Sequence, residues 1–302
     1  MAKQIESLIP EGLNILKKSP ELLIVSFLDS CLQIFLIFFW MMIALAGTIF
    51  LSAALMAAQA PNALIAVIVV SAVLGYLVLS FGISAFFQGA LIGGASIAAQ
   101  GKKPSFSRLV ERGKASFFDL LLASVILFAA SLLLFVLIMP AVLFAVMKDI
   151  PLAVAAGSFA MAVLMLGSTV IWLAFSPVYY IIVLGRFGVP DCFRKSIDFV
   201  KANLVAVLLL TFATTMLQSI IYAPFTVITG PIRWLDIAAE GVGSGIAGVL
   251  TLVFFGITLM ISKTLSAIWW VLYVKDAGGF PDDELEEEDE SGEVIDDVIV
   301  EV

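Results

Sequence analysis

Long apolar stretches that carry almost no charge constrain this chain more than any other feature, and they occur in pairs. Three short segments that begin with a proline and end with a lysine, residues 10–18, 104–114 and 190–201, each precede two such stretches. About 20 apolar residues suffice to cross a bilayer as a helix, and lipid offers the backbone no outside hydrogen-bond partner. The sequence therefore predicts an all-α, polytopic integral membrane protein. Its six transmembrane helices form three parallel repeats of an interfacial helix plus a transmembrane hairpin.

The six spans are expected near residues 22–55, 63–99, 117–146, 152–184, 204–229 and 241–274. Pro140, Pro177 and Pro224 interrupt spans three, four and five, and Gly230-Pro231 is expected to end the fifth. The chain then divides into a cytoplasmic interfacial amphipathic helix (1–20), a six-helix membrane domain (21–280) and an acidic tail (281–302). The three repeats cover residues 10–103, 104–189 and 190–280.

Composition excludes most enzyme classes. Hydrophobic residues make up 62% of the 302 positions and charged residues 13%, against about 45–50% and about 25% in soluble domains. Histidine is absent, which removes the usual general base near neutral pH and every nucleophile that depends on a histidine. Cys31 and Cys192 fall in different compartments of the predicted topology, so no disulfide is expected. We expect no enzymatic activity, no metal and no cofactor.

Charge is distributed very unevenly along the chain, whose net charge is −8. Twelve of the 24 acidic residues lie between Asp282 and Glu301, where no Lys or Arg occurs. The rest of the chain holds 16 basic and 12 (24 minus 12) acidic residues, a balance of +4. The tail is therefore expected to be disordered and solvated.

The basic residues also predict the orientation. Of the 16 Lys and Arg residues, thirteen lie at the chain ends or in the connections that open repeats two and three. The opposite turns contain only Lys148 and Arg233. The positive-inside rule then places both termini on the cytoplasmic side of a cell membrane.

Two segments resemble a known family. The stretch 185–203, GRFGVPDCFRKSIDFVKAN, and the small-residue stretch 89–95, GALIGGA, are similar to those of prokaryotic six-span membrane proteins related to the membrane domain of glycerophosphodiester phosphodiesterases. The resemblance covers residues 10–280 and implies the six-span fold. It implies no catalytic residue, because the chemistry of those phosphodiesterases belongs to a separate soluble barrel with catalytic histidines.

Two charges are expected deep in the membrane. Lys263 precedes Lys275 by twelve residues, which is roughly 18 Å at about 1.5 Å per residue. Asp29 follows Glu21 by eight residues, roughly 12 Å by the same rise. A charge at such depth needs a partner, so we predict a contact between Asp29 and Lys263. It is either a structural ion pair or part of an ion-coupled transport pathway.

The glutamines of the spans also have two possible explanations. Gln33, Gln88 and Gln218 lie nearer mid-membrane and are explained by hydrogen bonds between helices, or by a ligand site shared with the charged pair. The small-residue stretch 89–95 is expected to allow close helix packing. The three aromatic residues near the end of span six are expected to form an interfacial belt; they are Trp269, Trp270 and Tyr273.

The last residues of the tail differ from the acidic run before them. Val298, Ile299, Val300 and Val302 are β-branched and suited to adding a strand to the sheet edge of a partner. We expect a cytoplasmic protein partner to bind there.

These observations predict a non-enzymatic polytopic membrane protein, a structural or accessory component with a cytoplasmic acidic interaction tail. The alternative is a transporter or channel for a small or amphiphilic solute that uses Asp29 and Lys263. A scaffold needs a dry, closely packed interior, whereas a transporter needs a hydrated cavity lined by these charges and the glutamines. The lipid bilayer is the expected partner in both cases, nucleic acid is not, and the sequence leaves the oligomeric state open.

Overall fold

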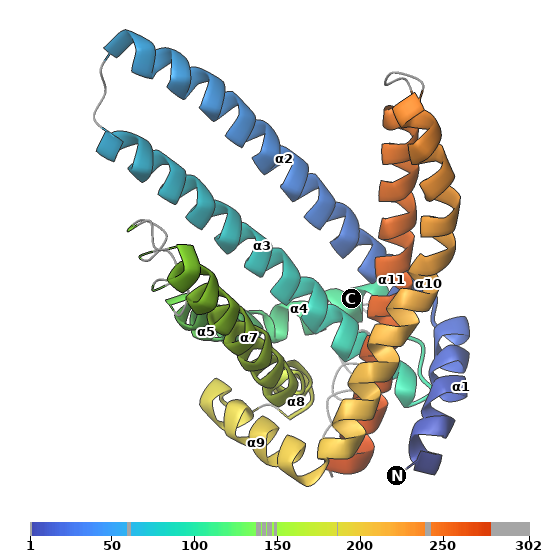
Figure 1. Ribbon diagram of the computed structural model, residues 1–302. Coiled ribbons are helices and arrows are strands. Elements are labelled where there is room, and N and C mark those ends of the chain that lie inside the picture. Colours follow the sequence, from blue (N-terminus) through green and yellow to red (C-terminus); the bar gives the residue numbers. More distant parts are fainter. Residues whose placement is uncertain are drawn as a thin grey trace, which may run out of the picture.

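The structure, a computed structural model, describes residues 2–58, 62–136, 150–185, 187–238 and 243–278, with Pro140, Leu143 and Met147, and nearly all of these residues are helical. The helices are α1 (Ala2–Lys18), α2 (Glu21–Ala58), α3 (Asn62–Ala99), α4 (Phe106–Ala115), α5 (Phe117–Phe135), α7 (Ile150–Phe175), α8 (Val178–Gly185), α9 (Val189–Ala202), α10 (Leu204–Ala238) and α11 (Gly243–Gly278) (Figure 1). No strand occurs among these residues. The predicted all-α fold is confirmed.

Six helical segments of the described chain are long and apolar enough to cross a membrane. They are Glu21–Trp40, Ser71–Ala99, Phe117–Leu134, Ile150–Gly185, Leu204–Ile221 and Gly256–Ala277. Several outward side chains on these segments leave 70% or more of their surface uncovered: Phe118, Leu133, Phe159 and Leu166. Such a surface is stable in lipid and not in water. The chain is thus a multi-pass membrane protein, as predicted.

One predicted helix boundary is wrong. Gly230-Pro231 does not end the fifth span, because α10 continues to Ala238. A proline removes one backbone hydrogen bond from a helix, but leaving the helix in an apolar environment would strand several backbone groups. A helix does occupy the first predicted segment, residues 1–20: α1 runs from Ala2 to Lys18 and contains Pro10. Pro177, in contrast, separates α7 from α8 where an interruption was expected.

The larger of two core clusters lies where α1, α2, α3, α10 and the C-terminal half of α11 meet, and a smaller cluster joins α3, α5, α8 and α9. In Figure 1 the α2–α3 and α10–α11 hairpins converge near α1 and separate toward their turns. We call the end where they converge, together with α1, α4 and α9, the basic end, because Lys102, Arg108, Arg112, Arg194 and Lys195 lie there.

The aromatic residues of α11 belong to this core, so the predicted interfacial belt is wrong. Trp269, Trp270 and Tyr273 are 4%, 4% and 6% exposed. The Trp270 ring stacks on Tyr180 of α8 with centroids 5.5 Å apart, and Tyr273 meets Phe199 of α9 edge-on at 5.8 Å. Neighbouring helices from other parts of the chain therefore take the place that lipid headgroups were expected to take.

Small residues let α4 approach α3 closely, as the 89–95 stretch predicted. A Cβ added to Gly93 would lie 2.7 Å from Cβ of Arg112, and one added to Gly113 would lie 2.9 Å from the Phe86 carbonyl oxygen. Real side-chain carbons do not approach so closely, so a larger residue at either position would force the two helices apart. The glycines of this stretch that contact α4 serve packing within the chain.

The three short amphipathic helices each pack on one end of a span. The helix α1 contacts α11, α4 contacts α3, and α9 contacts α8. The helix α4 of the second predicted repeat thus contacts the last helix of the first repeat, and α9 of the third contacts the last helix of the second. The helix α1, in the first repeat, contacts the last helix of the third.

Candidate functional site

A charged pair joins α2 to α11. Nζ of Lys263 donates a hydrogen bond to Oδ2 of Asp29, and the two side chains form an ion pair. The Asp29 side chain is 2% exposed and the Lys263 side chain 41%. The other carboxylate oxygen of Asp29, Oδ1, is buried without a hydrogen-bond partner among the described residues. The structure therefore brings together the two charges that the sequence singled out.

Hydroxyl groups extend this contact into a polar seam between the same two helices. Oγ of Ser26 and Oγ1 of Thr264 lie 2.7 Å apart. Thr264 donates its one hydroxyl proton to the Met260 carbonyl at 2.8 Å, so Ser26 is the donor to Thr264. Ser26 and Thr264 are 1% and 0% exposed, and Ser30 beside Asp29 is 7% exposed. The seam is covered by protein except on the Lys263 side.

The predicted glutamines do not gather around the charged pair. Gln33 pairs with Ser80 of α3: its Nε2 donates to the Ser80 carbonyl, and the Ser80 hydroxyl donates to Gln33 Oε1, both at 3.3 Å. Gln88 is half-buried on α3, and Gln218 is exposed on α10. The five residues thus divide into one ion pair, one hydrogen-bonded link between helices and two separate positions.

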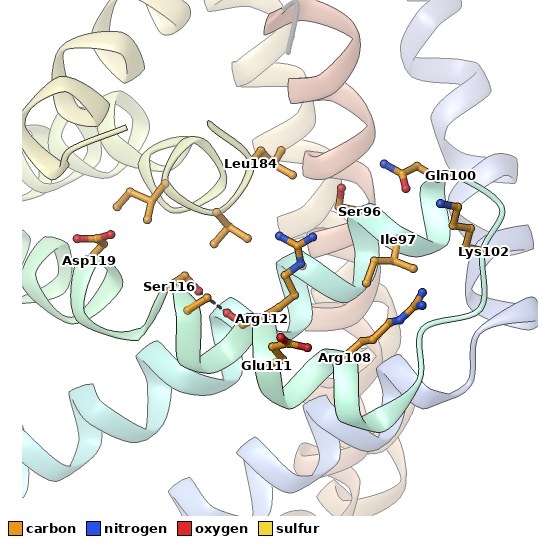
Figure 2. Close-up of a pocket in the computed structure, with 14 residues that line it drawn as sticks. Ser96, Ile97, Gln100, Lys102, Arg108, Glu111, Arg112, Ser116, Asp119 and Leu184 are labelled. Carbon is orange, nitrogen blue, oxygen red and sulfur yellow. Dashed lines mark hydrogen bonds between the residues drawn. The ribbon is translucent and has the colours of Figure 1, made fainter. Parts of the chain in front are cut away.

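A cavity of about 480 Å³ lies at the basic end, lined by the C-terminal part of α3, by α4, by the start of α5 and by the end of α8 (Figure 2). None of the five predicted intramembrane residues lines it. Its charged lining residues are Lys102, Arg108, Arg112, Glu111 and Asp119. The sequence did not predict this cavity.

Local sequence explains why α4 presents Arg112 to the cavity. Ser105 caps the N-terminus of α4 by accepting a hydrogen bond from the Arg108 amide at 3.4 Å. At the other end the Ser116 hydroxyl donates to the Arg112 carbonyl at 2.9 Å. Arg112 lies against Gly93, and its side chain extends along α3 toward Ser96 and Leu184 (Figure 2).

Two polar groups of the cavity wall lack partners. Ser96 is 4% exposed, and its Oγ has no hydrogen-bond partner among the described residues. Ser116 and Ser124, by contrast, donate to the carbonyl four residues earlier, as serines within helices commonly do. No carboxylate in the described part of the chain forms an ion pair with the half-buried Arg112. The cavity therefore offers two hydrogen-bond donors that the protein itself does not use.

One sequence signal could have located this cavity. The stretch 89–95 is directly followed by Ser96, and the next loop and helix hold a run of basic residues up to Lys114. Close packing of the small-residue helix against that basic helix places cations beside a serine. Taken separately in the sequence, the first feature indicates close helix packing and the second indicates only the orientation.

The fold and these contacts define an all-helical polytopic membrane protein with a charged pair inside its bundle and a basic cavity at one end. More specifically, the chain belongs to the family described as domain of unknown function (DUF7847), whose model matches residues 4–272. Comparison with curated proteins and with solved structures found no match. The family match gives no link to the membrane domain of glycerophosphodiester phosphodiesterases.

Proposed function

We propose that this protein is a non-enzymatic structural or accessory component of the membrane. The observation that carries the proposal is the polar seam between α2 and α11, in which Asp29 is paired with Lys263 and Ser26 with Thr264. Groups that satisfy one another inside a helix interface fix which helices meet and in which register. None of them lines the cavity of about 480 Å³, as a solute pathway through the pair would require.

The proposed topology places the basic end in the cytoplasm of the cell, with the three repeats related by an axis along the membrane normal. The distribution of Lys and Arg supports the orientation, and the packing of α1, α4 and α9 on α11, α3 and α8 supports the repeat. We also propose that the protein is related to the membrane domain of glycerophosphodiester phosphodiesterases, because residues 89–95 and 185–203 resemble stretches of that family.

The acidic tail is proposed to bind a cytoplasmic protein partner. Residues 281–302, with Val298, Ile299, Val300 and Val302, lie outside the described residues. Their twelve acids would be repelled by an anionic inner leaflet, which would display the β-branched end to soluble proteins.

One observation supports the alternative, a transporter or channel: the two side chains of the ion pair differ in exposure. The Lys263 side chain is 41% exposed, and Oδ1 of Asp29 has no hydrogen-bond partner among the described residues, so a solute that reached the pair could compete with Asp29 for Lys263. Hydration of the seam separates the two proposals, because a transporter needs water there and a scaffold does not.

Thiol accessibility measures this hydration. In a background with Cys31→Ala and Cys192→Ala, we would introduce Ser30→Cys in the seam and, as control, Lys114→Cys on α4. With a membrane-impermeant thiol reagent, Cys at position 30 is expected to stay unlabelled in vesicles of either orientation. The control is expected to react only when the cytoplasmic face is outside. Labelling at position 30 would reject the scaffold in favour of the transporter, and labelling of the control in intact cells would reverse the proposed topology.

The tail is tested with two variants. Deleting residues 282–302 is expected to leave the unfolding temperature unchanged and to abolish capture of a cytoplasmic partner. The second variant replaces all four β-branched residues by serine and keeps the charge. It is expected to lose capture as well, and retained capture there would mean that the acids, rather than the β-branched end, bind the partner.

A further inference from the structure

We propose that the cavity at the basic end binds a phosphate group, as a monoester, a diester or the free anion, through the Arg112 guanidinium and the Ser96 hydroxyl. This site is distinct from the seam between α2 and α11, and its argument does not depend on whether the protein is a scaffold or a transporter.

Arg112 supplies the charge. Its guanidinium extends into the cavity (Figure 2) and has no carboxylate partner in the described part of the chain. A half-buried cation without a counter-charge is costly, and a guanidinium presents paired N–H donors that match two oxygens of one phosphate. A bound phosphate would therefore supply what the protein leaves out.

Ser96 supplies a second donor from a different helix. Ser96 lines the same cavity, and its hydroxyl is almost completely buried and has no hydrogen-bond partner among the described residues. A buried hydroxyl without a partner is unfavourable, so the position of Ser96 beside Arg112 points to an acceptor that the described residues do not supply. Phosphate oxygens accept from both groups at once.

The charges of the lining sum to a small positive value, which favours an anion. Lys102 and Arg108 add two positive charges, whereas Glu111 and Asp119 add two negative ones, so Arg112 leaves the lining at +1. Lys102 and Arg108 each interact with another group, so we assign them a long-range attraction only. In Figure 2, Asp119 lies at the side of the view opposite Gln100 and Lys102, whereas Glu111 lies beside Arg112, so the attraction for an anion comes from the lining as a whole.

The position of the cavity admits two sources of phosphate. Ile97, Ile182 and Leu184 form apolar wall beside the two donors, as the glycerol region of a phospholipid would require. The cavity also lies at the basic end, where the spans of the bundle end, so it is within reach of both a lipid headgroup and a soluble phosphate.

The test uses the full-length protein purified in detergent, with two probes. Phosphatidylglycerol is compared with diacylglycerol, which has the same acyl chains and no phosphate, by native mass spectrometry, as the ratio of lipid-bound to free protein. Inorganic phosphate against chloride of equal ionic strength is compared by the rise in unfolding temperature. The variants are Arg112→Gln, Ser96→Ala and the control Lys114→Gln, which removes one charge from the same helix outside the cavity.

We expect Arg112→Gln to weaken binding about tenfold or more, since hydrogen bonds to charged groups contribute about 1.5–3 kcal/mol. Ser96→Ala should weaken it about threefold, and Lys114→Gln should leave it unchanged. Binding of phosphatidylglycerol alone identifies a headgroup site, and binding of inorganic phosphate identifies a soluble ligand. The proposal is overturned if neither probe binds, or if Lys114→Gln weakens binding as much as Arg112→Gln. Should Arg112→Gln fail to fold, unchanged binding by the small Ser96→Ala variant would overturn it.

Discussion

Removing either partner of the Asp29–Lys263 pair should destabilise the protein, but by unequal amounts. The Asp29 side chain is 2% exposed and Lys263 41%. Lys263→Met therefore strands a carboxylate inside the helix interface, at a cost of about 3–5 kcal/mol. Asp29→Asn leaves an ammonium that can turn toward its open side, so we expect roughly 1–2 kcal/mol, closer to the value of an exposed pair.

The double variant Asp29→Asn with Lys263→Met removes both charges and should cost about 1 kcal/mol or less, because a neutral pair of similar size packs in the same place. The sum of the singles is about 4–7 kcal/mol, so the coupling free energy should be about 3 kcal/mol or more. Equilibrium unfolding of the four proteins in mixed detergent micelles measures it. Gln218→Leu, at an exposed position of α10, is the matched control and should change stability by less than about 0.5 kcal/mol.

Additivity would refute this reasoning. If the double variant loses as much as the two singles together, within about 0.5 kcal/mol, the charges do not interact energetically. If Asp29→Asn costs more than Lys263→Met, the burial-based order is wrong and the ammonium is the constrained partner.

Three further predictions concern packing and one thiol. Trp270→Ala should destabilise the protein by about 3–5 kcal/mol, seen as a lower unfolding temperature, because it removes the ring stacked on Tyr180. Gly94→Ala should cost about 1–3 kcal/mol, since the new Cβ would lie 2.7 Å from Leu22 Cδ2, whereas Gly188→Ala meets nothing within 4 Å and should be near neutral. Burial, assisted by a nearby carboxylate, raises the pKa of the Cys192 thiol from 9.0 to about 11. In a Cys31→Ala background its alkylation at pH 8 should be about a hundredfold slower than that of an ordinary thiol, and should accelerate about tenfold per pH unit up to pH 11; fast reaction at pH 8 would contradict this.

The spans were predictable because lipid imposes one simple requirement, a long apolar helix. The charged pair was predictable for a related reason: two isolated charges at membrane depth, one near each end of the membrane domain, leave little choice of partner. Residue counts place Asp29 roughly 12 Å and Lys263 roughly 18 Å along their helices from the same end, a difference that the long lysine side chain spans.

The surroundings of each helix were not predictable. Sequence periodicity separates polar from apolar faces, but it does not show which apolar face contacts protein and which contacts lipid. Trp269, Trp270 and Tyr273 have the composition of a lipid-facing belt and lie in the core. The cavity escaped prediction for the same reason: Ser96 and Arg112 belong to different helices and become neighbours only through the approach of α4 to Gly93.

The uneven burial of the spans explains why polar and ring contacts concentrate on α11. In the Gly256–Ala277 window 67% is buried within the protein, against 6% for Ile150–Gly185. Lipid tails solvate apolar side chains as well as other helices do, so apolar character alone gives α11 no reason to stay inside the bundle. Directional contacts must hold it there: the Lys263–Asp29 ion pair, the Thr264–Ser26 hydrogen bond and the stacking of Trp270 on Tyr180. Each links α11 to α2 or α8, so these contacts fix the relative positions of helices that lipid alone would leave free to separate.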